Sequence, residues 1–225
     1  MVQIKQNLAH RQNYGGKRTQ KVEWIVMHYT ANDGDSDESN AKYFQQPLNP
    51  VASAHYFVDD DSITCSVPED YVAYHCGAQT YRHPICRNAN SIGIEMCDAR
   101  RDGKVQATDK TIANAAELAA QLCKKYSIPV DHIIRHYDVT GKLCPAYWVQ
   151  GDGLANFRQQ VARLLGEKNS KIIINGKEYG VDRVLQGGVN YIKLRDIAAA
   201  LEAAGVCRLE VGSKGNIAVL THKEK

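Results

Sequence analysis

Two histidines and one cysteine have the types and spacing of a metal site. His28 ends an apolar segment, His136 begins a polar loop, and Cys144, followed by a proline, closes that loop. A loop of this length can fold the last two side chains toward one point. Imidazole and thiolate ligands suit Zn2+, and three protein ligands leave a position for water, as in catalytic rather than structural sites. We therefore predict a zinc site of His28, His136 and Cys144, although each residue type alone is more often ordinary core or surface.

Two charged residues near this set could carry acid–base chemistry. Glu95 lies in an apolar segment, where alternation puts Ile92 and Ile94 on one strand face and Glu95 on the other. Such a carboxylate is costly unless it is paired or catalytic. Beside an activated water it would be a general base; on an edge strand it would simply face solvent. Lys142, close to Cys144, would stabilise an oxyanion or be an ordinary loop lysine.

The elements that must position these residues alternate between strand and helix. Apolar, β-branched segments predict strands at 22–29, 54–58, 91–97 and 133–136, the last running into a loop. Apolar residues at helical spacing predict helices at 36–46, 108–126 and 154–165. Thr108 is expected to cap the longest of these helices. This alternation favours the α/β class.

The sequence pattern changes after the last amphipathic helix, where a short polar segment is followed by a hairpin pattern. We predict a catalytic domain at 1–166, a polar linker at 167–170 and a second, small α+β domain at 171–225. In the small domain, Asn175-Gly176 predicts a hairpin turn between two strands. A helix is expected at 195–204 and a last pair of strands around 213–216.

Composition excludes several classes of protein. The 225 residues are 44% hydrophobic and 24% charged, which is typical of a globular protein. A net charge of +3 is too weak to indicate nucleic-acid binding. No apolar run reaches the roughly 18 residues of a membrane span. No signal peptide is visible and the seven cysteines are odd in number, so we expect cytoplasmic synthesis with reduced thiols.

Four motifs, in this order, carry a resemblance to a known family. They are IVMHYT at 25–30, SAHYFVDD at 53–60, NSIGIE at 90–95 and RHYD…GKLCP at 135–145. Together they resemble the zinc-dependent N-acetylmuramoyl-L-alanine amidases of the type 2 class. This class includes phage endolysins and shares a fold with peptidoglycan recognition proteins. The resemblance covers about residues 1–165 and implies a central mixed β-sheet flanked by helices, with Zn2+ in a groove along one side.

The resemblance also implies roles for individual residues. His28, His136 and Cys144 match the zinc ligands of the family. Glu95 matches the catalytic glutamate of the endolysin branch, and Lys142 matches the lysine thought to steady the oxyanion. These matches agree with the chemistry expected from the residue types.

Two further histidines are predicted to contact substrate. His55 follows Ala54, which stands where one branch of the family has a catalytic tyrosine, so the resemblance leaves the proton transfer to Glu95. His55 itself would hydrogen-bond near the site or pack beneath it. His75 matches a region that lines the substrate groove in relatives; the alternative is an ordinary loop histidine.

The implied function is hydrolysis of the amide between N-acetylmuramic acid and L-alanine in bacterial peptidoglycan. A phage or prophage endolysin, released to the wall by a holin, fits a chain without a visible signal peptide. One alternative is a non-catalytic binding module of the same fold, which the presence of Cys144 argues against. Another is a metal-free hydrolase with Cys144 as nucleophile. Neither nucleic acid nor membrane is expected as a partner.

The C-terminal region resembles a different kind of domain. The hairpin at 172–179 and the segment NYIKLRDIA at 190–198 resemble the small stalk-type domain named after the N-terminal domain of copper amine oxidases. This resemblance implies an accessory module, without implying copper. Wall binding, self-association into a homo-oligomer and a stabilising role without ligand remain open.

Overall fold

The chain forms two compact units, Met1–Val161 and Ala162–Lys225. The computed structural model describes residues 2–101, 103–166, 170–186, 189–214 and 217–223. The boundary between the units falls inside the last helix of the first unit, α4 (Gly153–Leu164). Of the predicted linker, 167–169 lie outside the described residues, and residue 170 opens a strand. The predicted domain limit at 166 therefore stays a prediction.

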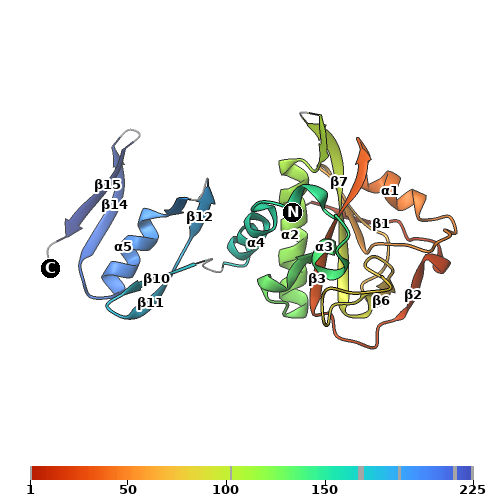
Figure 1. Cartoon of the computed structure of the whole chain (residues 1–225). Helices are drawn as coiled ribbons and strands as arrows, with labels where there is room; N and C mark the ends of the chain where they lie inside the picture. Colours follow the sequence, from red (N-terminus) through yellow and green to blue (C-terminus); the bar gives the residue numbers. More distant parts are fainter. Residues whose placement is uncertain (1, 102, 167–169, 187–188, 215–216, 224–225) are drawn as a thin grey trace. The chain divides into compact units, whose positions relative to one another are not determined.

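A seven-stranded mixed sheet forms the centre of the first unit (Figure 1). Its order is β1 (Ile4–Gln6), β5 (Ile63–Cys65), β4 (Tyr56–Val58), β7 (Ser91–Arg101), β3 (Trp24–Asp33) and β9 (Ile133–Arg135), with β8 (Lys104–Gln106) on β7. β3 is parallel to both of its neighbours, whereas β4 is parallel to β7 and antiparallel to β5. The predicted central mixed sheet is thus confirmed. A smaller pair, β2 (Tyr14–Lys17) with β6 (Tyr71–Ala73), was not expected from the sequence.

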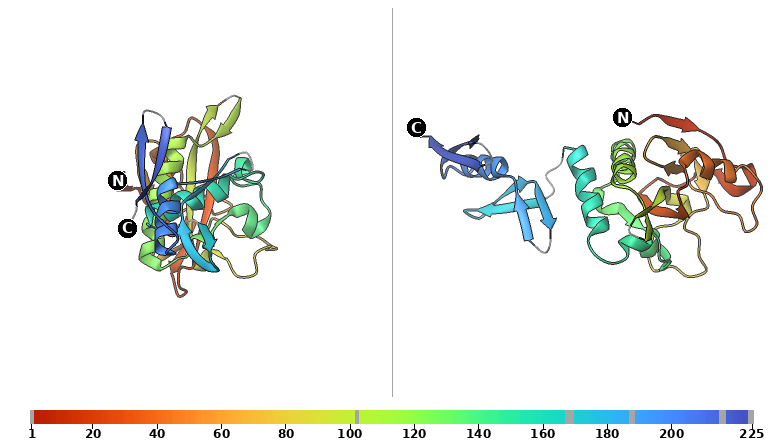
Figure 2. Two further views of the ribbon diagram at one scale, coloured as in Figure 1. Left: turned by 90° about the vertical axis from the view of Figure 1, so that its left-hand side faces the viewer. Right: turned by 90° about the horizontal axis from the view of Figure 1, so that it is seen from above.

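Helices lie on both faces of this sheet (Figures 1 and 2). α1 (Asp37–Tyr43) places Ala41 in a buried cluster with Phe57 of β4, and Phe57 pairs in register with Glu95 of β7. In-register neighbours point to the same face, so α1 covers the face of Glu95. α2 (Asp109–Tyr126) lies on the opposite side, with the first turns of α4 beside it.

Local capping explains where the helices begin. Ser36 caps α1 and exchanges hydrogen bonds with Ser39, so this helix starts as predicted but ends at Tyr43 rather than at residue 46. The Thr108 hydroxyl accepts a hydrogen bond from the Thr111 amide at 3.0 Å, as expected for the cap of α2.

The segment after β9 departs from the prediction. A loop was expected, but His136–Thr140 forms a short helix, α3. The Asp138 carboxylate accepts from the Arg135 amide at 2.8 Å and from its guanidinium at 2.6 Å, which fixes the first turn. Gly141, with φ of 88°, ends the helix in the left-handed conformation. Short 3₁₀ helices in the described residues are η1 (Arg11–Asn13), η2 (Asn88–Asn90), η3 (Val130–His132) and η4 (Ala146–Trp148).

After the end of α4, the described residues of the second unit form three hairpins and the helix α5 (Leu194–Ala203). Its strands pair as β10 (Ser170–Ile174) with β11 (Lys177–Val181), β12 (Arg183–Gln186) with β13 (Val189–Ile192), and β14 (Arg208–Lys214) with β15 (Ile217–Lys223). Asn175 and Gly176 have φ of 51° and 76°, as the predicted primed turn requires. The second hairpin was not predicted, and residues 215–216 of the last expected turn lie outside the described residues. In the described part of the chain, no helix is long and apolar enough to cross a membrane.

Candidate active site

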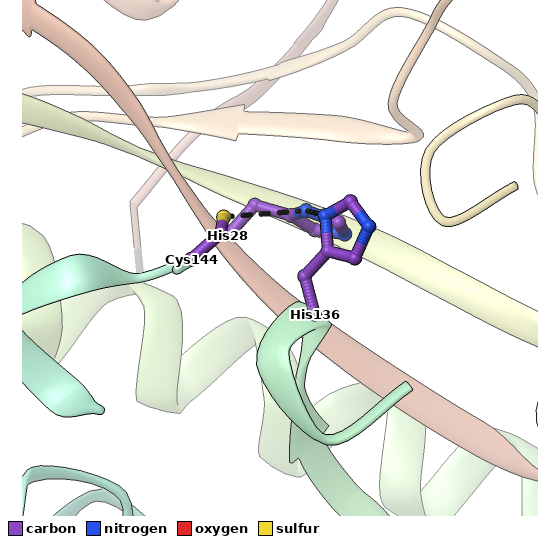
Figure 3. Close-up of side chains that lie close together, drawn as sticks. All are labelled: His28, His136 and Cys144. Atoms are coloured by element: carbon purple, nitrogen blue, oxygen red, sulfur yellow. Dashed lines mark hydrogen bonds between the residues drawn. The ribbon is translucent and has the colours of Figure 1, made fainter. Parts of the chain in front are cut away.

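Three side chains that are far apart in sequence meet in the first unit (Figure 3). His28 lies on β3, His136 opens α3, and Cys144 follows α3; all three are buried. His28 Nδ1 is 3.1 Å from His136 Nδ1 and 3.7 Å from Cys144 Sγ. The three candidate ligand atoms all lie within 4.8 Å of one another.

The donor set fits a zinc ion. Tetrahedral Zn2+ with Zn–N bonds of about 2.0–2.1 Å and Zn–S bonds of about 2.3 Å holds its ligand atoms about 3.3–3.6 Å apart. The two distances from His28 Nδ1, 3.1 and 3.7 Å, are close to these values, whereas the set as a whole spans up to 4.8 Å, so His136 and Cys144 would draw together on binding the ion. Burial lowers the pKa of His28, and it lowers the pKa of His136 to about 4. Both imidazoles are therefore neutral near pH 7, which is the form that binds metal.

Cys144 is also suited to a cation. Burial, with Glu95 nearby, raises the pKa of the Cys144 thiol to about 12. A coordinating metal reverses this effect, because it binds the thiolate and deprotonates the thiol outright. The Tyr137 amide donates to the Cys144 carbonyl at 3.0 Å, which ties the cysteine back to α3.

Glu95 lies directly beside the three candidate ligands. It pairs in register with His28 across β3 and β7, and its Oε1 is 3.9 Å from His28 Nδ1. The side chain is 22% exposed, and Oε2 has no hydrogen-bond partner among the described residues. Burial raises the pKa of Glu95 to about 8, although the charge of Lys142 lowers it. The alternative of an edge-strand glutamate in solvent is wrong, because β7 is an inner strand.

Lys142 lines two cavities, of which one includes the candidate ligand Cys144 and the other includes His136. It is exposed. One cavity, of about 650 Å³, has an aromatic and aliphatic wall made by Tyr29, Tyr43, Phe44, Phe57 and Leu143, with Glu95 at its base. The other, of about 850 Å³, has a wall of mixed polarity that includes Val51, Gln79, Asn88 and His136. The aromatic wall could not be predicted from the sequence, because its residues come from four separate segments.

His55 lies inside the protein. It is completely buried, and its Nδ1 accepts a hydrogen bond from the Gly93 amide at 2.9 Å. Its Nε2 lies 2.6 Å from the Arg18 guanidinium and 3.3 Å from the Tyr71 carbonyl. His55 does not line either of the two cavities. This placement favours packing beneath the site over contact with substrate.

His75 is placed at the edge of the second cavity but is only 9% exposed. Its Nδ1 lies 3.1 Å from His28 Nε2, and its Nε2 lies 3.1 Å from the Ser91 hydroxyl. The contact with His28 was not predicted, because it joins a loop to a strand with no shared periodicity.

Comparisons with known proteins identify the family of this chain. The profile of the Amidase_2 family, described as N-acetylmuramoyl-L-alanine amidase, matches residues 18–147. The N-acetylmuramoyl-L-alanine amidase CwlL of Bacillus licheniformis is 36% identical over 232 residues, covering 96% of this chain and 63% of the relative. A probable N-acetylmuramoyl-L-alanine amidase of the same species is also 36% identical and is covered over 64% of its length. The chain thus spans less than two thirds of these relatives.

Solved structures match about three quarters of the chain. A mutant endolysin from Bacillus subtilis is 27% identical, with a TM-score of 0.59, over 72% of this chain and 99% of that structure. The catalytic domain of PlyG is 26% identical, with a TM-score of 0.61, over 75% of this chain and 99% of that domain.

Proposed function

Because the chain belongs to the Amidase_2 family of N-acetylmuramoyl-L-alanine amidases, we propose that it hydrolyses the amide between N-acetylmuramic acid and L-alanine in peptidoglycan. One observation carries the proposal. His28, His136 and Cys144 converge next to Glu95, and two cavities that share Lys142 are lined by Cys144 and by His136. A binding module would need the cavities but not this combination of ligands and a buried carboxylate.

We assign the cofactor as Zn2+, held by His28, His136 and Cys144. The ion would supply Lewis acidity, polarising the scissile carbonyl and activating water. The family and the donor spacing support this choice of metal.

Glu95 is proposed as the proton carrier. The base is the ionised carboxylate, which the charge of Lys142 favours and which a cation held by the neighbouring ligands would favour further. It would take a proton from the attacking water and return it to the departing alanine nitrogen, which would otherwise have to leave as a high-energy amide anion. Its place beside His28, with one unpartnered oxygen among the described residues, supports this role. Lys142, the exposed cation that lines both cavities, would stabilise negative charge on the carbonyl oxygen. The products are a glycan with a free lactyl carboxylate and a free stem peptide.

The shape of the site supports a substrate that is bulky on both sides of the scissile bond. The two cavities share Lys142 in their walls, so glycan and peptide would extend from it into separate cavities. We further propose an endolysin that acts on the wall after release by a holin, supported by the similarity to solved endolysins. The second unit is proposed as an accessory module for wall binding or self-association, supported by its resemblance to stalk-type domains.

The decisive experiment identifies the new chemical ends released from purified peptidoglycan. We expect free alanine amines and no new reducing sugars, with loss of release in a chelator and recovery on adding Zn2+. Release that ignores the chelator would indicate Cys144 as a nucleophile and contradict the zinc assignment. Absence of new ends from several wall types would contradict the hydrolase function itself.

A further inference from the structure

A chain of three hydrogen bonds leads from the backbone to the candidate ligand His28. The Ser91 hydroxyl lies 2.7 Å from the Arg87 carbonyl, His75 Nε2 lies 3.1 Å from Ser91 Oγ, and His28 Nε2 lies 3.1 Å from His75 Nδ1. All these side chains are buried or nearly so, and they lie on the face of the sheet that carries Glu95.

The number of available protons decides which group donates in each of these three hydrogen bonds. A carbonyl only accepts, so Ser91 must give its single hydroxyl proton to Arg87 and can only accept from His75. The proton of a neutral His75 is therefore on Nε2, and its Nδ1 carries a lone pair. His28 must then carry its own proton on Nε2 and donate it to His75.

This order leaves His28 Nδ1 without a proton. That atom lies 3.1 Å from His136 Nδ1 and 3.7 Å from Cys144 Sγ. The tautomer set by Ser91 and His75 is thus the one whose lone pair points at the other two candidate ligands. A partner on the second ring nitrogen commonly fixes the tautomer and orientation of a metal-binding histidine.

The packing around His75 holds it in this place. A side chain on Gly93 would put a Cβ 2.6 Å from His75 Cγ, so the imidazole occupies the space that the missing side chain leaves. The His28 and His75 rings meet edge to face, with an interplanar angle of 85°. Both ring nitrogens of His75 are engaged, so neither is free to bind substrate.

We propose that His75 is a positioning residue: together with Ser91, it holds His28 in the tautomer that presents Nδ1 to the metal. The inference rests on the proposed zinc site for its purpose. The tautomer itself is a property of the metal-free protein and can be measured apart from hydrolysis.

The first test reads the tautomers directly. Long-range proton–nitrogen correlation spectra of the full, histidine-labelled, metal-free chain should show both His28 and His75 protonated on Nε2. In Ser91→Ala, His75 loses its acceptor, and the Nδ1-protonated form of either ring should appear. Ser66→Ala is the matched control, because it removes another fully buried hydroxyl that has no partner among the described residues. A wild-type His28 protonated on Nδ1 would overturn the proposal.

The second test measures zinc affinity by competition with a chromophoric chelator. His75→Leu removes the acceptor for His28 Nε2 and should weaken zinc binding about 10–100-fold. His75→Asn puts an amide oxygen near the position of His75 Nδ1, where it can still accept from His28 Nε2, and its zinc affinity should stay within about threefold of wild type. Wild-type affinity in His75→Leu would overturn the proposal. If His75→Leu does not fold, Ser91→Ala decides, with an expected loss of affinity that Ser66→Ala lacks. Failure of zinc binding in the wild type would instead contradict the proposed metal site and leave the tautomer result standing.

Discussion

Glu95 is a carboxylate that is both largely shielded from solvent and directly beside a candidate metal ligand. The inner position of β7 removes its carboxylate from most solvent, and the register with β3 sets it against His28. A structural glutamate in such a place would have hydrogen-bond donors around both oxygens. Oε2 has no such partner among the described residues, so the position is suited to a group that exchanges its partner during a reaction.

Replacing this carboxyl tests its role at constant size. We expect Glu95→Gln to lower amine release from peptidoglycan about 10²–10⁴-fold, because an amide does not accept the proton. Bound zinc should be unchanged, since Glu95 is not among the three ligands. The measurement is the initial rate of alanine amine release together with the metal content of the purified protein.

Glu38→Gln is the matched control for this change. Glu38 lies on the same unit, is 59% exposed and does not line the cavity beside Glu95. Its variant should hydrolyse like the wild type. Full activity in Glu95→Gln would remove Glu95 from the mechanism.

Gly93 is the other residue whose type is dictated by the site. An added methyl group must displace the His75 ring, so we expect Gly93→Ala to lower the free energy of unfolding by about 1–3 kcal/mol. Gly16→Ala meets no atom within 4 Å and should be neutral or slightly stabilising. Urea titrations of the two variants provide the comparison. Equal midpoints would mean that the His75 ring moves aside freely.

At the level of elements, prediction succeeded where a pattern is long. β7 and α2 repeat their apolar residues over several turns or pleats, and their predicted positions are close to the observed ones. α3 has five residues, too few to set up a helical period, and it owes its first turn to Asp138. The hairpin β12–β13 has short strands without strict alternation. Both elements follow from contacts that no local pattern contains.

One partly buried carboxylate links two elements and makes stability depend on pH. Glu69 accepts from Tyr56 of β4 at 2.5 Å and pairs with Lys125 of α2 at 3.1 Å. Burial acts to raise the pKa of Glu69, but hydrogen bonds from Tyr126, Tyr56 and Lys125 outweigh it and lower the pKa overall. A lowered pKa means that the charged form stabilises the fold above the unfolded value of about 4.3, and that this stability is lost as the pH falls.

We therefore expect Glu69→Gln to destabilise the protein by about 1–2 kcal/mol at neutral pH and by less at pH values near 3. Urea midpoints of wild type and variant across this range measure the difference. Asp70→Asn is the control, since Asp70 is 61% exposed and its pair with Lys17 spans 3.7 Å. A pH-independent gap between wild type and Glu69→Gln would show that the charge of Glu69 is not responsible.

For the whole molecule, the candidate ligands could be predicted from the sequence, whereas the residues that surround them could not. His28, His136 and Cys144 are recognisable because a histidine ending an apolar strand and a His–Cys loop are unusual by themselves. The neighbours that orient them are not. His75, Ser91 and Arg87 lie in a loop and at a strand start, and only the folded chain brings them to His28. The aromatic wall around Tyr43 and Phe57 likewise depends on the packing of α1 against the sheet.

The division into two units leads to the last prediction. All candidate site residues lie within Met1–Val161, and the family profile matches residues 18–147, which fall inside this unit. Two solved structures are covered over 99% of their own length by about three quarters of this chain. We expect residues 1–166 alone to fold and to cleave a small soluble muramyl peptide within about twofold of the full chain. If the second unit binds the wall, the shortened chain should sediment with whole walls about tenfold less, because it loses one of two attachment points.

Two measurements on the same pair of proteins separate the proposed roles of the second unit. Sedimentation with walls tests binding, and the molar mass of the full chain in light scattering tests self-association. Loss of wall binding with a monomeric full chain would assign the second unit to the substrate, because a single copy then provides the extra contact. An oligomeric full chain and a monomeric shortened one would assign it to association, since added copies of the first unit also raise avidity. If the shortened chain binds walls and cleaves them as well as the full chain does, and both are monomeric, the second unit has neither role.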